Sequence, residues 1–270
     1  MRQPFEPRSL RRTILGMAYY GSSVHIACAF SIVEILAVLY GKHLRYPDGR
    51  PDHPSRDYLI LSKGHGVMAQ YACLLEMGWI APHELTNYYK DGTRLYGLAE
   101  AWIPGVEVTS GSLGHGLSIG AGLALAAKRH ATEQMCYAVV GDGETNEGSI
   151  WEALQFAAQQ RLDNLIVIVD KNDFQAMGCT ADILAPGDMV AKFAAFGFDT
   201  MLVDGHDQDA LHAALSTFKM RKNGQPKSII AKTVKGRGVS FMENSNLWHY
   251  TRLDATTFAA ALSELGAAGE

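Results

Sequence analysis

Two polar residues stand at the ends of two apolar segments, and their types suit a hard metal cation. Asp142 follows segment 136–140, and Asn172 follows segment 165–169. A helix predicted at 149–160 separates the two segments, and such strand–helix–strand units are almost always right-handed with parallel strands. The carboxyl ends of parallel strands open at one edge of the sheet, where ligands bind. A carboxylate, an amide oxygen and a nearby backbone carbonyl at that edge suit Mg²⁺ or Ca²⁺.

The turn 141–148 between the first of these strands and the helix is rich in glycine and acidic residues. Mg²⁺ keeps coordination places for water and phosphate oxygens, so a diphosphate ligand fits beside it. Gly141 and Gly143 let the backbone approach such a ligand closely. The helix that begins near Ser149 can direct its free N–H groups there as well.

The rest of the chain predicts an α/β fold in which helices flank a parallel sheet, because strand and helix patterns alternate. Asp207 is the expected N-cap of the last predicted helix. Further strands are predicted at 58–62, 198–203 and 228–233, and helices at 5–20, 26–41, 67–77, 117–131 and 208–219, with loops at 42–57 and 90–109.

Composition excludes several classes of protein. The 270 residues are 47% hydrophobic and 19% charged, which argues against disorder. A net charge of −4 gives no basic excess for nucleic-acid binding. The most apolar stretch, 24–40, contains His25 and Glu34 and is too short to span a bilayer. The chain has no signal-peptide pattern and four widely spaced cysteines, so we expect a cytoplasmic protein without disulfides or a zinc site.

The segment 141–153, GDGETNEGSIWEA, followed by DKN at 170–172, resembles the thiamine-diphosphate motif. Three further segments resemble transketolase: LSKGHG at 61–66, PGVEVTSGSLGHG at 104–116, and TVKGRGVSFMEN at 233–244 with Trp248 and His249. The resemblance covers residues 10–252 and corresponds to the diphosphate-binding part of a full transketolase. It implies a single thiamine-diphosphate-binding domain over residues 1–270.

The resemblance also implies a role for each matching residue. The ligands of a divalent metal (Mg²⁺, Ca²⁺ or Mn²⁺) would be Asp142, Asn172 and the carbonyl of Phe174. The contacts of the diphosphate would be the Gly143 N–H, His65 and His249. The backbone of Gly111 and Leu113 would meet the aminopyrimidine ring of the cofactor. His25, His65 and His249 would lie near the reacting carbonyl, and Glu147 would link two cofactor sites across a subunit interface.

The reaction that the resemblance implies is transfer of a two-carbon ketol unit from a ketose to an aldehyde. The pyrimidine-binding domain of the family, which carries the glutamate that activates the cofactor, is absent from this sequence. We therefore expect the N-terminal subunit of a split transketolase, inactive alone and completed by a C-terminal partner in an α2β2 assembly.

Several positions depart from the family pattern on the substrate side. Leu98 stands where the family has a histidine that binds donor hydroxyls, and a leucine side chain forms no hydrogen bond. Ile26 and Ala27 follow His25 in place of Pro-Gly, His115 replaces a glutamine, and Tyr250 replaces a glycine. These changes suggest an altered substrate: a specialised sugar, a sulfonated sugar or a carrier-bound acceptor.

Three alternatives compete with this interpretation. The α subunit of a 2-oxo-acid dehydrogenase shares the GDG…N motif, although the segments at 62–66 and 238–249 argue against it. A non-catalytic or regulatory partner subunit is kept open by Leu98. A nicotinamide-dinucleotide-binding domain is disfavoured, because no GxGxxG stands between a strand and a helix.

The other histidines are expected to be structural or superficial. His206 is expected to serve in a turn and helix cap, and His43, His53, His83, His130 and His212 are expected at the surface. Cys28, Cys73 and Cys136 lie in apolar runs and are expected in the core.

Overall fold

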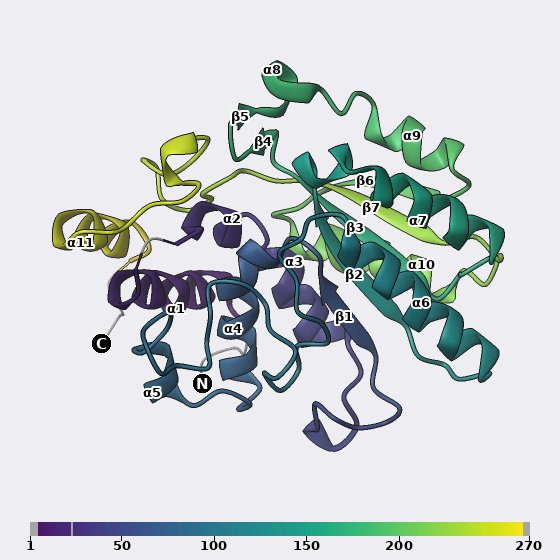
Figure 1. Ribbon diagram of the computed structural model, residues 1–270, viewed down its shortest axis with the longest axis horizontal. Helices are drawn as coiled ribbons and strands as arrows, with labels where there is room; N and C mark the ends of the chain where they lie inside the picture. The colour runs from purple at the N-terminus through teal and green to yellow at the C-terminus, as the bar shows by residue number, and fades with distance from the viewer. Residues whose placement is uncertain (1–4, 23, 267–270) are drawn as a thin grey trace.

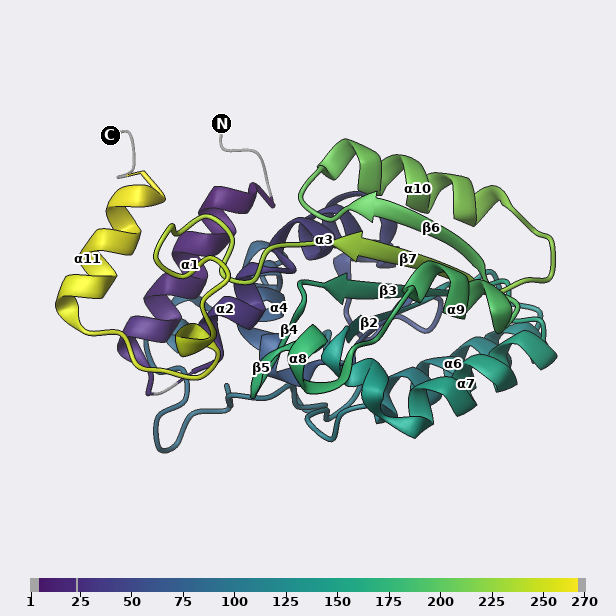
Figure 2. The ribbon, with the colours of Figure 1, turned by 90° about the horizontal axis from the view of Figure 1, so that it is seen from above.

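The computed structural model describes residues 5–22 and 24–266, which are arranged as one central sheet covered by helices on both faces (Figures 1 and 2). The strands are β1 (Tyr58–Leu61), β2 (Cys136–Gly141), β3 (Leu165–Lys171), β6 (Asp199–Asp204) and β7 (Lys227–Lys232), with a short hairpin of β4 (Phe174–Gln175) and β5 (Gly178–Cys179). The helices are α1 (Pro7–Tyr20), α2 (Ile26–Phe30), α3 (Val33–Val38), α4 (Val67–Glu76), α5 (Pro82–Leu85), α6 (His115–Arg129), α7 (Gly148–Gln159), α8 (Thr180–Leu184), α9 (Met189–Ala195), α10 (Gln208–Met220) and α11 (Ala255–Glu264).

The central sheet has the order β1-β2-β3-β7-β6, and every neighbouring pair is parallel. In β2 and β3, residues Cys136–Val140 and Leu165–Asp170 are buried. This is expected for strands that carry helices on both faces. The predicted α/β class, with a parallel sheet flanked by helices, is confirmed.

Strand residues alternate between two hydrophobic clusters, one on each face of the sheet. Tyr137 and Val139 pack with the cluster that includes α1, α3, α4 and α10. Ala138 and Val140 pack with residues of α6, α7 and α9 on the other face. Because successive side chains of β2 point to opposite faces of the sheet, this strand contributes residues to both hydrophobic clusters.

The predicted helix at 26–41 is divided into α2 and α3, and its last residues belong to a π-helical turn at 39–43. Ser31, between the two helices, donates to the Asp170 carboxylate at 2.7 Å. The break thus places a polar contact of the α2–α3 segment against β3, within the most apolar stretch of the chain.

The first and last helices of the chain lie side by side (Figures 1 and 2). The rings of Tyr19 in α1 and Phe258 in α11 stack with centroids 4.2 Å apart. Val24 and Thr251 form an isolated antiparallel bridge near them. The bridge brings the flanking residues His25 and Tyr250 to one place, with ring centroids 4.7 Å apart.

Candidate functional site

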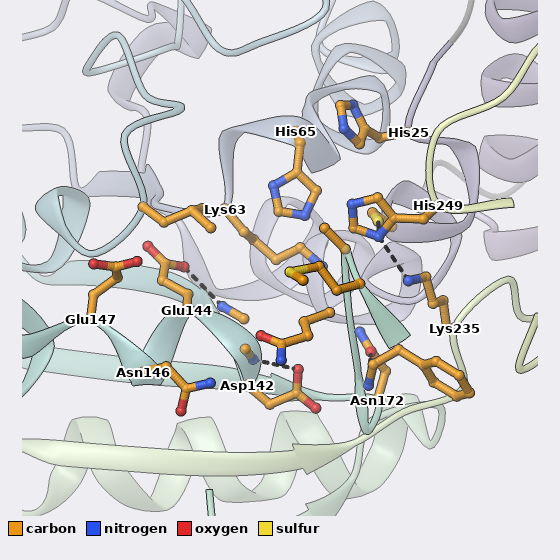
Figure 3. Close-up of a pocket in the computed structure, with 18 of the residues that line it drawn as sticks. His25, Lys63, His65, Asp142, Glu144, Asn146, Glu147, Asn172, Lys235 and His249 are labelled. Carbon is orange, nitrogen blue, oxygen red and sulfur yellow. Dashed lines mark hydrogen bonds between the residues drawn. The ribbon is translucent and has the colours of Figure 1, made fainter. Parts of the chain in front are cut away.

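A cavity of about 420 Å³ opens at the carboxyl ends of β1, β2 and β3 (Figure 3). This cavity is lined by all ten site residues that were predicted from the sequence: His25, His65, Gly111, Leu113, Asp142, Gly143, Glu147, Asn172, Phe174 and His249. They come from six separate segments, so the sheet edge brings them together as the parallel topology predicts.

Asp142 and Asn172 occupy the floor of the cavity, and both are buried. Asp142 Oδ2 accepts a hydrogen bond from the N–H of Asp173 at 2.6 Å. The amide of Asn172 donates from Nδ2 to Asp170 at 2.9 Å, and its Oδ1 accepts from the N–H of Phe174 at 3.0 Å. Asp170 therefore fixes which end of the Asn172 amide can face a cation.

These oxygen donors fit the metal that the sequence implied. Among residues 5–22 and 24–266, no cluster of three or more His, Cys, Asp or Glu side chains is arranged to hold a metal ion. A cation at this place would instead depend on one carboxylate with amide and carbonyl oxygens. Such a set suits Mg²⁺, which also retains places for water and phosphate oxygens.

The electrostatics of the floor favour a cation. Burial, together with the neighbouring carboxylate of Asp170, raises the pKa of Asp142 to about 7. Charging Asp142 is therefore costly without a partner, and a bound dication would remove that cost.

The N–H of Gly143 does not point freely into the cavity. It donates to Oδ1 of Asp142 at 2.7 Å. A diphosphate contact through this N–H would need to replace or share that bond.

Three imidazoles form the opposite wall (Figure 3). Ring centroids are 5.2 Å apart for His25 and His65, 5.3 Å for His25 and His249, and 5.8 Å for His65 and His249. Burial and nearby lysines lower the pKa of His25 to about 4 and that of His249 to about 3, and burial holds the pKa of His65 well below its usual value. All three are neutral at pH 7, so each ring can donate one hydrogen bond and accept another.

The tautomer of His249 is set by its neighbour. Lys235 Nζ lies 2.8 Å from His249 Nδ1 and donates to it, so the ring proton resides on Nε2. Lys235 also donates to Asn246 Oδ1 at 3.0 Å. Both partners are neutral, and the ammonium charge of Lys235 is left to attract an anion in the cavity.

The sequence reasoning missed other polar residues of this cavity, among them Lys63, Glu144, Gln175 and Lys235. Lys63 and Lys235 lie inside the motif segments KGHG and TVKGRG. Their positions in these motifs, close to predicted site residues, could have identified them from the sequence. Lys63 pairs with Asp170 in the interior. That carboxylate also accepts from Ser31 and Thr233, and these partners outweigh burial and lower the pKa of Asp170.

Glu144 connects three loops that border the cavity. Its Oε1 accepts from the hydroxyl of Ser62 and from the N–H of Gly114 at 2.8 Å. Its Oε2 accepts from the N–H of Gly141 at 3.0 Å. A single buried carboxylate thus fixes the loops after β1, before α6 and after β2 relative to one another.

The remaining predicted residues lie on the cavity wall toward α6 and α7. Leu113 lies just before α6, and its carbonyl contacts His115 Nδ1 at 3.2 Å. Gly111 adopts φ +152°, and a Cβ there would lie 2.7 Å from Leu98 Cδ1. Glu147 is exposed at the start of α7 and makes no side-chain capping bond.

A second pocket, of about 460 Å³, adjoins the first and shares His25 and Leu98 with it. Its lining also includes Tyr89, Tyr96, Tyr250 and Glu100. Leu98 and Tyr250, two of the departures noted in the sequence, therefore meet beside His25 in one vestibule.

One expectation about the other histidines is wrong. His43 is buried, and its Nε2 lies 2.9 Å from Nδ1 of the half-buried His212. The π-helical turn at 39–43 packs near α10 and so covers a position that its polarity suggested was exposed. His206 lies in the expected turn, but it also contacts Glu34 at 2.9 Å and accepts from the N–H of Val234 at 2.8 Å.

Other expectations hold. Asp207 caps α10 through the N–H groups of Asp209 and Ala210. Cys28, Cys73 and Cys136 are buried, and the four cysteines are free. Within the described part of the chain, no helix is long and apolar enough to cross a membrane.

The fold and the cavity agree with what sequence comparison finds. Residues 14–270 match the family described as "Transketolase, thiamine diphosphate binding domain". The chain belongs to the transketolase family, within its thiamine diphosphate-binding domain.

Two curated relatives are similar over most of both chains. The chain is 39% identical over 260 residues to one subunit of the apulose-4-phosphate transketolase of Actinobacillus succinogenes, covering 96% of this chain and 94% of that one. It is 38% identical over 242 residues to the 6-deoxy-6-sulfo-D-fructose transketolase subunit SqwG of Clostridium sp., covering 89% and 88%.

Among solved structures, transketolase from Leishmania mexicana superimposes with a TM-score of 0.91 at 30% identity. That alignment covers 98% of this chain and 42% of the Leishmania chain. The present chain thus spans less than half the length of that transketolase.

Proposed function

We propose that this chain is the N-terminal subunit of a split, two-component transketolase. It would bind thiamine diphosphate and a divalent metal and, with a C-terminal partner, transfer a two-carbon ketol unit from a ketose to an aldehyde. The observation that carries the proposal is the single cavity that gathers all ten residues. The names of the two relatives as transketolase subunits support the need for a partner.

The floor of the cavity would hold the metal and the diphosphate. Asp142, Asn172 and the carbonyl of Phe174 offer hard oxygen ligands, and Mg²⁺ is the metal that best fits them. Lys235 adds a cation whose hydrogen-bond partners are both neutral. Lys63 lies beneath the same floor, where Asp170 balances its charge.

The three histidines would act at the reacting carbonyl. When bound, thiamine diphosphate supplies carbanion chemistry. His249, with its proton on Nε2, can donate a hydrogen bond to a substrate oxygen as charge develops there. His25 and His65, both neutral, can take up and return protons in the same space.

The pyrimidine-binding half belongs to the partner. Glu147 is exposed at the cavity rim and would face that second chain. The complete enzyme would be a cytoplasmic α2β2 heterotetramer. The family match favours this function over a 2-oxo-acid dehydrogenase subunit.

The test is a calorimetric titration of thiamine diphosphate with Mg²⁺, performed with and without the candidate partner chain, followed by an assay of ketol transfer. We expect tight binding and activity only when both chains are present. Activity of the purified chain free of any partner would contradict the split-site proposal.

We propose further that the substrate differs from the ordinary sugar phosphates. The vestibule presents three tyrosines, Leu98 and one carboxylate, Glu100. This wall offers apolar and aromatic contact and little attraction for an anion. Turnover of xylulose 5-phosphate with ribose 5-phosphate at ordinary transketolase rates by the assembled enzyme would refute an altered substrate.

A further inference from the structure

One buried hydrogen-bond donor in the cavity has no partner. Among the described residues, eight buried side-chain atoms lack a hydrogen bond, and only Gln175 Nε2 belongs to a residue that lines the cavity. A buried donor without an acceptor costs free energy. In a ligand cavity, such a donor indicates that the ligand itself supplies the acceptor.

Gln175 lies directly against the turn that carries Asp142. A Cβ placed on Gly143 would be 2.7 Å from Gln175 Cβ and 3.3 Å from Oε1. The absence of a side chain at Gly143 therefore allows the β4–β5 hairpin to contact this turn. The amide is held beside the predicted metal and diphosphate ligands.

The hairpin is attached on both sides, so its backbone is positioned before any ligand arrives. The N–H of Asp173 binds Asp142, just before β4. Asn246 Nδ2 donates to the carbonyl of Ala176 at 2.9 Å, just after β4. Lys235 Nζ lies 5.4 Å from the ring centre of Phe174. A hairpin backbone fixed in this way loses little freedom when a ligand binds.

The neighbouring groups select the kind of acceptor. A metal held by Asp142 and Asn172 does not pair with an N–H donor, whereas oxygens of an anion beside that metal do. The ammonium of Lys235 lines the same cavity and favours the same anion. We infer that Gln175 Nε2 donates a hydrogen bond to an oxygen of the diphosphate, an inference that rests on the proposed function.

The test compares three variants with the wild-type chain. Gln175→Met keeps the length of the side chain and removes the donor, and Gln175→Glu keeps its shape and adds a negative charge. Gln159→Met is the matched control, because it makes the same glutamine-to-methionine substitution on the exposed surface of α7. Affinity is measured by calorimetry for pyrophosphate with Mg²⁺ on the chain alone, and for thiamine diphosphate with Mg²⁺ on the chain with its partner.

We expect Gln175→Met to weaken both affinities about tenfold, as for loss of one hydrogen bond to a charged group. Gln175→Glu should weaken them further, because a carboxylate repels the anion. Gln159→Met should match the wild type, and the melting temperatures of the ligand-free variants should stay within a few degrees. A ¹⁵N-labelled wild-type chain should show a shift of the Gln175 side-chain signal on addition of pyrophosphate.

Unchanged affinity in Gln175→Met would overturn the inference, since the donor would then meet only water, and it would leave the proposed function intact. Absence of binding by the wild type, even with its partner, would overturn both. The two failures are therefore distinguishable.

Discussion

Asp142 is the residue on which the cavity floor depends most. It is buried, its pKa is raised to about 7 by burial and by Asp170, and its two oxygens join the turn after β2 to the start of the hairpin. A cation would offset the cost of charging it, so its main contribution belongs to the ligand-bound protein.

We therefore predict that Asp142→Ala abolishes metal-dependent binding of thiamine diphosphate, with at least a hundredfold loss of affinity by calorimetry. The melting temperature of the ligand-free chain should change far less than the affinity. Asp182→Ala, in the short helix α8, is the control. Retained affinity in Asp142→Ala would remove this residue from the proposed metal set.

At the substrate side, Leu98 is the residue whose replacement is most informative. It borders both the cavity and the vestibule, and its Cδ1 lies close to Gly111. We predict that Leu98→His in the assembled enzyme raises kcat/KM for ordinary ketose phosphates at least tenfold, because an imidazole can bind donor hydroxyls. If the ratio of kcat/KM values for different substrates is the same in Leu98→His and the wild type, Leu98 does not set specificity.

At the scale of elements, the loops around the cavity are held by Glu144. We predict that Glu144→Gln destabilises the chain by about 1–3 kcal/mol, because the amide nitrogen cannot accept from the N–H groups that the carboxylate now binds. The melting temperature should fall by about 2–4 °C for each kcal/mol. Glu133→Gln, at a side chain that is 92% exposed, should leave the melting temperature unchanged. Equal stability of Glu144→Gln and the wild type would contradict this role.

The π-helical turn at 39–43 and helix α10 share the His43–His212 contact. Burial lowers the pKa of His43 to about 4, with further contributions from Lys219, His212 and Lys42. Between pH 6.5 and 4 the unfolded chain thus binds more protons at this position than the folded chain. The free energy of unfolding must fall as pH falls through that window.

We predict that His43→Gln reduces the difference in unfolding free energy between pH 7 and pH 5, measured with urea. His25 and His249 titrate in the same direction, so part of the difference should remain. His83→Gln, at an exposed position, should leave the wild-type difference unaltered. An unchanged difference in His43→Gln would contradict the prediction.

Patterns in the sequence predict the regular elements well and the polar interior poorly. Long apolar runs such as 136–140 and 165–169 give strands with ends at the observed places or within two residues of them. The two-residue strands β4 and β5 are too short to show a period, and helix α11 also went unpredicted. Lys63 and Asp170 pair across 107 positions, which no local pattern reveals. Asp142, Gly143 and Asn172 follow from the strand pattern and the glycine-rich turn. The other site residues follow from the family motifs, whereas Gln175 lacks either signal.

At the scale of the whole molecule, the proposed cofactor site is divided between two chains. Every proposed ligand of the metal and the diphosphate lies in this chain, whereas the half that activates the pyrimidine ring is expected in the partner. We predict that Mg²⁺ with pyrophosphate raises the melting temperature of this chain alone, and that thiamine without its diphosphate does not. At a hundred times the dissociation constant, the stabilisation would be about 2.7 kcal/mol. Stabilisation by thiamine alone would argue that this chain binds both ends of the cofactor.

The Val24–Thr251 bridge has a consequence for the order in which the protein folds during its synthesis on the ribosome. His25 emerges during synthesis long before His249, yet the cavity needs both. The sheet can begin to form while the chain is still growing, but its cofactor pocket cannot close until the segment around residue 249 has been made. A chain truncated before residue 249 would therefore lack one wall of this cavity.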